Sequence, residues 1–220
     1  MSFGYLGDTS TKIKQRVKND GVLSIDDVRE LEVNKQIGGS YQLVQTFDFG
    51  GAAFLDIDVS VLGGYDVVFW IGEGITLNSD DAFSVRISKT GDSAIDTGAT
   101  NYEFGMNSTT YAGTLSESGS TGANNFQLST DFNSATNDHL DFILYGYNLL
   151  NTAHPVFTFH SNFVDASAQA TSRTAHGGAE YTQNAVLDVV RFFPTFGSAT
   201  QINGKVSMYG FKAQWVLKDF

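Results

Sequence analysis

The chain contains no cysteine and only 2 prolines among its 220 residues. The absence of cysteine excludes disulfide frameworks, thiolate metal sites and cysteine nucleophiles. The scarcity of proline excludes collagen-like segments and proline-rich linkers. Charged residues are also few, at 17% of the chain against about 25% in an average domain. What remains is a chain rich in phenylalanine (18) and glycine (23), a composition typical of an all-β protein with many turns.

Basic residues are in deficit, with 13 Lys and Arg against 24 Asp and Glu, for a net charge of −11. A chain this acidic lacks the positive surface that binds nucleic acid, so no nucleic-acid partner is expected. It has no run of 18 apolar residues, so we expect no membrane insertion. Its first residues show no basic stretch followed by an apolar one, so we expect no secretory signal peptide.

The motifs of the common catalytic and metal sites are missing as well. None of the four histidines belongs to an HxH, HxxxH or HExxH motif, and no GxSxG motif is present. Glutamates that could form a glycosidase pair are scarce after residue 40, although aspartates could take their place. Residues 78–81 (NSDD) offer oxygen atoms for calcium, but we interpret them as a turn before a strand. We therefore predict no enzymatic activity, no cofactor and no metal.

The charge is unevenly distributed along the chain. Residues 1–40 hold six basic and six acidic residues, whereas residues 41–220 carry the whole net charge. Within the neutral part, residues 24–27 (SIDD) have the form of a capping box, and the glycine pair at 38–39 is a helix stop signal. We predict a helical N-terminal segment over residues 1–39, which has too few apolar residues for a core of its own.

From residue 40 onward the apolar residues follow a period of two, which predicts β-strands. The segments with this pattern are 41–49, 55–61, 65–71, 83–87, 102–106, 140–144, 157–160, 186–193 and 209–217. Gly, Asn, Asp and Ser separate them, as in sandwiches of antiparallel strands. The predicted fold is mainly β: an antiparallel, jelly-roll-like β-sandwich over residues 40–220, preceded by the short helical segment.

Two stretches of this domain are rich in Ser, Thr, Gly and Ala and contain few large apolar residues. We expect long loops over residues 108–125 and 165–178, and loops of this length are commonly functional. The side chains best suited to contact a partner from these loops are Tyr111, Arg173 and His176. That partner could be a host surface or a neighbouring subunit.

Two predicted strands carry large apolar side chains on both faces, at 67–71 (VVFWI) and 189–193 (VVRFF). A strand that is apolar on both faces must be covered on both. We therefore expect the chain to associate with itself, and the low fraction of charged residues agrees with such an interface.

Short stretches at both ends of the chain carry a distinctive pattern. They are residues 2–15 (SFGYLGDTSTKIKQ), 21–28 (GVLSIDDV), 35–41 (KQIGGSY), 189–193 (VVRFF) and 204–212 (GKVSMYGFK). These stretches resemble small virion structural proteins of tailed bacteriophages, marine ones in particular. The family commonly has Asp-Gly-Ile where this chain has Asp-Val-Val at 188–190, and this chain continues past the usual end of the family.

The resemblance implies a component of the virus particle, made in the host cytoplasm, with the N-terminal segment as a shared docking module and no catalytic residues. Its expected partners are other virion proteins of the capsid or tail, further copies of itself as a trimer by analogy with phage appendages, and host surface glycans. The apolar residues that we expect to dock it to the particle are Phe3, Tyr5, Leu6, Ile13 and Val17.

Three roles on the particle are compatible with these features. The first is host attachment by the exposed β-sandwich, as in a short tail fibre, a spike or a receptor-binding protein. The second is a capsid decoration or cement protein that stabilises the head. The third is a particle-borne glycan hydrolase, for which no catalytic pair stands out in the sequence.

Overall fold

Alternating apolar and polar side chains form twelve β-strands in the part of the chain that the computed structural model describes, residues 41–92, 94–166 and 171–211. The strands are β1 (Gln42–Asp48), β2 (Leu55–Asp58), β3 (Val67–Leu77), β4 (Phe83–Lys89), β5 (Tyr102–Thr110), β6 (Leu115–Ala123), β7 (Phe126–Gln127), β8 (Leu140–Tyr147), β9 (Val156–Val164), β10 (Ser172–Tyr181), β11 (Leu187–Pro194) and β12 (Ile202–Phe211). A short 3₁₀ helix, η1 (Ser60–Leu62), follows β2.

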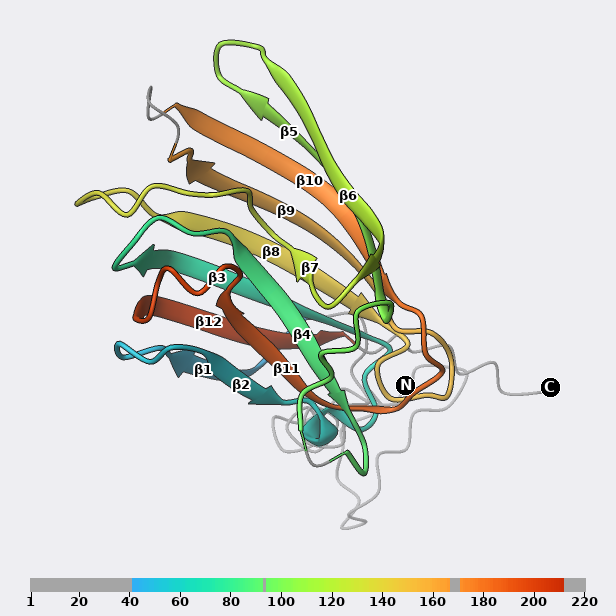
Figure 1. The fold of residues 1–220 in the computed structure, drawn as a ribbon. Coiled ribbons are helices and arrows are strands. Elements are labelled where there is room, and N and C mark those ends of the chain that lie inside the picture. Colours follow the sequence, from blue (N-terminus) through green and yellow to red (C-terminus); the bar gives the residue numbers. More distant parts are fainter. Residues whose placement is uncertain (1–40, 93, 167–170, 212–220) are drawn as a thin grey trace, which may run out of the picture. The chain divides into compact units, whose positions relative to one another are not determined.

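The strands form two antiparallel sheets (Figure 1). The larger sheet has eight strands in the order β1-β12-β3-β8-β9-β10-β5-β6, and the smaller has four in the order β2-β11-β4-β7. Many neighbours, such as β1 and β12 or β2 and β11, are far apart in the sequence. The prediction of a mainly β, antiparallel and sandwich-like fold is confirmed.

Aromatic side chains between the two sheets form the core. Phe192 of β11 packs against Trp70 of β3 and Phe142 of β8, with ring centroids 6.4 and 5.4 Å apart. Phe83 of β4 joins the same group at 6.0 Å from Phe142. Since these rings come from both sheets and are almost fully buried, the sheets pack face to face.

The expectation of two long loops is wrong for most of both stretches. Residues 108–125 contain the end of β5 and the whole of β6, joined by a short turn. Residues 171–178 lie in or beside β10, which pairs with β9 on one side and β5 on the other. Their Ser, Thr and Gly residues form strands because their backbone pairs with that of the neighbouring strands. Their side chains show little alternation of apolar and polar residues.

Small residues in β10 have a packing reason. Phe157 and Phe159 of the neighbouring β9 fill the core at this point and are buried. A Cβ atom at Gly177 would lie 2.3 Å from the carbonyl oxygen of Gly105 and 2.7 Å from the Phe159 ring. The strand therefore contributes backbone to the sheet and leaves the core volume to its neighbour.

The two strands that are apolar on both faces are covered largely by the chain itself. Phe69 of β3 is only 8% exposed, because the rings of Tyr41, Tyr145 and Tyr209 surround it at 4.9 to 5.5 Å. Phe193 of β11 is 9% exposed under the Arg86 guanidinium, 4.5 Å from its centroid. These positions do not by themselves require a second subunit, and the trimer stays a prediction.

The helical segment over residues 1–39 lies outside the described residues, and so do its docking residues Phe3, Tyr5, Leu6, Ile13 and Val17. The domain boundary near residue 40 stays a prediction as well. Among the residues described, no helix is long and apolar enough to cross a membrane.

Candidate functional site

Strand alternation sorts the side chains of the eight-stranded sheet onto two faces. On β8, Phe142 points into the core, where it contacts Phe192 of the smaller sheet. Its neighbours Asp141 and Ile143 therefore point away from the smaller sheet. We call this side of the eight-stranded sheet the outer face.

The strand register places outer-face residues from different strands beside one another. One row crosses β3, β8, β9, β10, β5 and β6 through Ile71, Ile143, His160, His176, Asn107 and Glu117. The next row contains Asp141, Asn162, Thr174 and Thr109. A polar surface with an isoleucine pair at one end is thus built from residues that are widely separated in the sequence.

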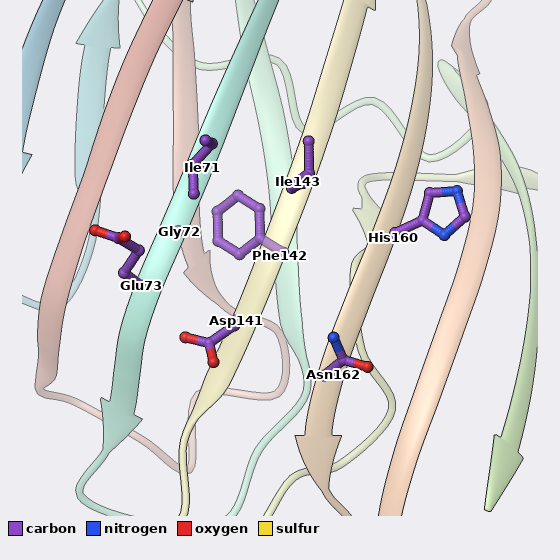
Figure 2. Close-up of a pocket in the computed structure, with 8 residues that line it drawn as sticks. All are labelled: Ile71, Gly72, Glu73, Asp141, Phe142, Ile143, His160 and Asn162. Carbon is purple, nitrogen blue, oxygen red and sulfur yellow. The ribbon is translucent and has the colours of Figure 1, made fainter.

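A hollow of about 410 Å³ opens on this face between β3, β8 and β9 (Figure 2). Its lining residues are Ile71, Gly72, Glu73, Asp141, Phe142, Ile143, His160 and Asn162. Gly72 pairs with Phe142, and a Cβ atom at Gly72 would lie 2.1 Å from the Phe142 ring, on the core side of the sheet. The glycine therefore lets Phe142 pack close beneath β3.

A β-bulge shapes the rim of this hollow. The register of β3 against β8 shifts between Gly72 and Ile75, and Gly74 takes a left-handed conformation with φ of 61°. The Gly74 N–H then donates a hydrogen bond of 2.8 Å to Oδ1 of Asp141. The bulge thus fixes the Asp141 carboxylate at the edge of the hollow.

Two carboxylates line the hollow, and each already has a partner. Lys205 Nζ lies 2.8 Å from Glu73 Oε2, and the hydrogen bond and charge of Glu73 raise the pKa of Lys205 above its ordinary value. Nε2 of His139 lies 3.1 Å from Asp141 Oδ2. Both carboxylates are about half exposed, so they remain accessible as hydrogen-bond acceptors.

A second, smaller hollow of about 170 Å³ adjoins the first. Its lining residues are Tyr111, Asn137, His139, Asp141, Asn162, Phe163, Val164, Ser172 and Arg173. Asp141 and Asn162 line both hollows, so the two adjoin at these residues, and together we call them the outer-face groove. Oδ1 of Asn162 accepts a 3.0 Å hydrogen bond from Thr174 Oγ1, which orients the amide at the junction.

An aromatic cluster borders the groove. Phe69 and Tyr145 lie two positions along their strands from Ile71 and Ile143, on the same face. Tyr209 stacks on Phe69 with centroids 4.9 Å apart. The groove therefore runs beside an aromatic border.

The three predicted contact residues have different positions. Tyr111 lies in the turn between β5 and β6, is 75% exposed and lines the smaller hollow. His176 lies on the outer face of β10, 6.0 Å from His160 between ring centroids. Neither Arg173 nor His176 is in a loop, since both belong to β10.

Arg173 is also less accessible than a loop residue would be. Its side chain is 16% exposed and forms an ion pair with Asp165. It also donates hydrogen bonds of 3.3 Å to the hydroxyls of Ser108 and Ser116. These contacts tie β10 to β5 and β6, so Arg173 borders the groove mainly as a structural residue.

Sequence reasoning missed the main residues of the groove: Glu73, Asp141, His160 and Asn162. The available signal was the strand alternation, which places polar residues on the outer side of β8 and β9. It could not bring Glu73 beside Asp141, because the pairing of β3 with β8 is set by the fold.

The acidic turn at 78–81 holds a loop in place, in agreement with its interpretation as a turn. Asp81 is fully buried and accepts hydrogen bonds from the N–H groups of Phe196, Ser198 and Ala199 at 2.8 to 3.2 Å. Oδ1 of Asn78 accepts two more, from the backbone after that loop. In the described part of the chain, no group of three or more His, Asp or Glu side chains is arranged to hold a metal ion.

Comparison with known proteins finds no matching family model and no matching curated protein.

Proposed function

We propose that this chain is a non-enzymatic structural protein of a tailed bacteriophage particle that attaches to the host. Residues 1–39 dock it to other virion proteins, and the β domain, a jelly-roll-like sandwich that assembles as a trimer, is exposed. The observation that carries the attachment role is the outer-face groove. Its polar groups stand on paired strands and are oriented by neighbours, as in the pre-formed sites that bind ligands.

Adsorption competition tests this role. The purified full-length chain, added to host cells before the phage, should occupy the receptor and lower the rate of phage adsorption. A chain that binds no host cells and leaves adsorption unchanged would contradict the attachment role. Labelling the chain on intact particles distinguishes attachment from decoration. Label density on the head lattice instead of the tail would favour the decoration protein.

The docking segment has its own test in the full-length chain. We expect the combined change Phe3→Ser, Tyr5→Ser and Leu6→Ser to leave a folded β domain that no longer joins particles. The matched control replaces Thr9, Ser10 and Thr11 by alanine and should be incorporated normally. Normal incorporation of the first variant would refute the docking assignment.

A glycan hydrolase is the second candidate, because the structure brings Glu73 and Asp141 into one hollow. Paired carboxylates of this kind cleave glycosidic bonds when one donates a proton and the other acts as base or nucleophile. Here Lys205 and His139 bind the two carboxylates, which favours a role as fixed acceptors. Reducing-sugar release from host polysaccharide that Glu73→Gln or Asp141→Asn abolishes would establish the hydrolase instead.

A further inference from the structure

We infer that the outer-face groove is a binding site for an uncharged oligosaccharide, laid across β3, β8 and β9 towards the turn that holds Tyr111. This inference rests on the proposed attachment function and names the class of ligand and the residues that take it. It follows from the shape, the polarity and the charge of the groove.

The shape fits a chain-like ligand. Two open hollows of about 410 and 170 Å³ share Asp141 and Asn162 as their common border. A compact ligand would fill one of them and leave the other empty. A linear chain of sugar rings can occupy both, with its middle at the shared residues.

The polarity fits a ligand with many hydroxyl groups and apolar ring faces. Asp141 and Glu73 present carboxylate oxygens, which form the stronger, charge-assisted hydrogen bonds with hydroxyl donors. Asn162 and the exposed His160 add groups that can donate or accept. Ile71 and Ile143, both half-buried, offer an apolar surface to the C–H side of a sugar ring.

Tyr111 supplies an aromatic surface at the far end of the groove. It is 75% exposed and has no ring partner among the described residues. An exposed tyrosine combines an apolar ring face with a polar hydroxyl, a combination that suits an amphipathic ligand such as a sugar. We therefore place the last sugar ring of the chain against Tyr111.

The charge disfavours an acidic ligand. The basic side chains at the groove are already paired, Lys205 with Glu73 and Arg173 with Asp165. The chain as a whole carries a net charge of −11, which repels polyanions such as acidic polysaccharides. A hydroxyl ligand can use the carboxylates without displacing those partners.

Binding of defined oligosaccharides to the full-length chain tests the inference. The probes are malto-, laminari- and cello-hexaose as neutral chains, an alginate hexamer as the acidic chain and a chitosan hexamer as the basic chain, each titrated by calorimetry. We expect saturable binding of a neutral hexamer. Asn162→Ala and Tyr111→Ala should each weaken it about tenfold or more, since each removes a direct contact.

His154→Ala is the matched control for His160→Ala, because His154 is also a solvent-accessible histidine but does not line the groove. It should leave binding unchanged, whereas His160→Ala should weaken it. Circular dichroism and thermal melting confirm that each variant is folded.

The outcomes separate the site from the function. If no neutral hexamer binds, if the alginate or chitosan hexamer binds more tightly, or if the groove variants bind as well as the parent chain, the inference is overturned. Adsorption competition by the parent chain would still support attachment in those cases. If a neutral hexamer binds but the chain does not compete with phage, the groove is a glycan site and the attachment role is wrong.

Discussion

Single residues in this domain are held by neighbours that come from distant parts of the chain. Asp81 is the clearest case, because three backbone N–H groups of the loop after β11 converge on its buried carboxylate. Asp56 is similar, since both its oxygens accept hydrogen bonds of 2.6 Å from Arg191. Acidic side chains such as these thus connect strands and loops of the domain.

The pH dependence of stability can be predicted at Asp131. Partial desolvation, together with the charges of Asp80, Asp81 and Asp165, raises the pKa of this exposed carboxyl above its ordinary value. Its ionisation is therefore harder in the folded chain than in the unfolded one. The resulting destabilisation is absent below the ordinary pKa of about 3.9 and develops as the pH rises through the folded-state pKa.

We therefore expect Asp131→Asn to raise Tm at neutral pH and to change it little near pH 3, where the carboxyl is protonated in both states. Thermal melts followed by circular dichroism at the two pH values measure this. Glu117→Gln, at an exposed carboxylate of β6, is the control and should not reproduce the difference. An Asp131→Asn variant that melts at or below the parent temperature at neutral pH would show the reasoning to be wrong.

At the scale of the element, β10 shows that a strand can be defined by its neighbours rather than by its own side chains. It pairs with β9 and β5 along nearly its whole length, while its core-facing positions include Ala175, Gly177 and Ala179. The space they leave is taken by the phenylalanines of β9.

Two adjacent glycines of β10 give a matched pair of substitutions. Gly177→Ala places a Cβ atom 2.3 Å from the Gly105 carbonyl oxygen, whereas at Gly178 the nearest atom is the Phe157 carbonyl oxygen at an ordinary 3.5 Å. We expect Gly177→Ala to lower the free energy of unfolding by about 1–3 kcal/mol, as overpacking does. Gly178→Ala should be neutral or slightly stabilising.

Urea unfolding of both variants measures the difference. Equal stability of the two would mean that β10 can shift to accept the extra methyl group, and that its small residues are not required by packing.

At the scale of the whole molecule, the remaining apolar surface bears on self-association. The domain covers Phe69 and Phe193 with its own side chains, yet Tyr41 and Leu43 remain 61% and 57% exposed on or beside β1. The case for an oligomer therefore depends on this border of the sheet rather than on the two strands that suggested it.

We predict that the full-length chain associates with itself in solution, because exposed apolar groups at this border are stabilised when another copy covers them. The expected number of three copies comes from the analogy with phage appendages. Light scattering coupled to size exclusion measures the mass directly. Leu43→Lys should shift the mass towards the monomer, and Leu115→Lys, at an exposed leucine of β6, is the control. A mass near 23.8 kDa for the parent chain at micromolar concentration would contradict the trimer.

The sequence by itself determined the local features of this protein. Apolar alternation at 140–144 and 157–160 predicts strands there, because the period of two is a property of each strand alone. The structure has strands over Leu140–Tyr147 and Val156–Val164. The same alternation already assigns Asp141, His160 and Asn162 to a polar face. The absence of cysteine and of metal-binding motifs was equally readable without a structure.

Only the tertiary structure decided which strands are neighbours and what lies between them. Pairing of β3 with β8 brings Glu73 to Asp141, and pairing of β8 with β9 adds Asn162. Those contacts join distant segments, so their register depends on the packing of the whole sandwich and not on local composition. For the same reason, residues 108–125 and 171–178 looked like loops in the sequence but form strands, since hydrogen bonds to neighbouring backbones define a strand even where side chains leave no pattern.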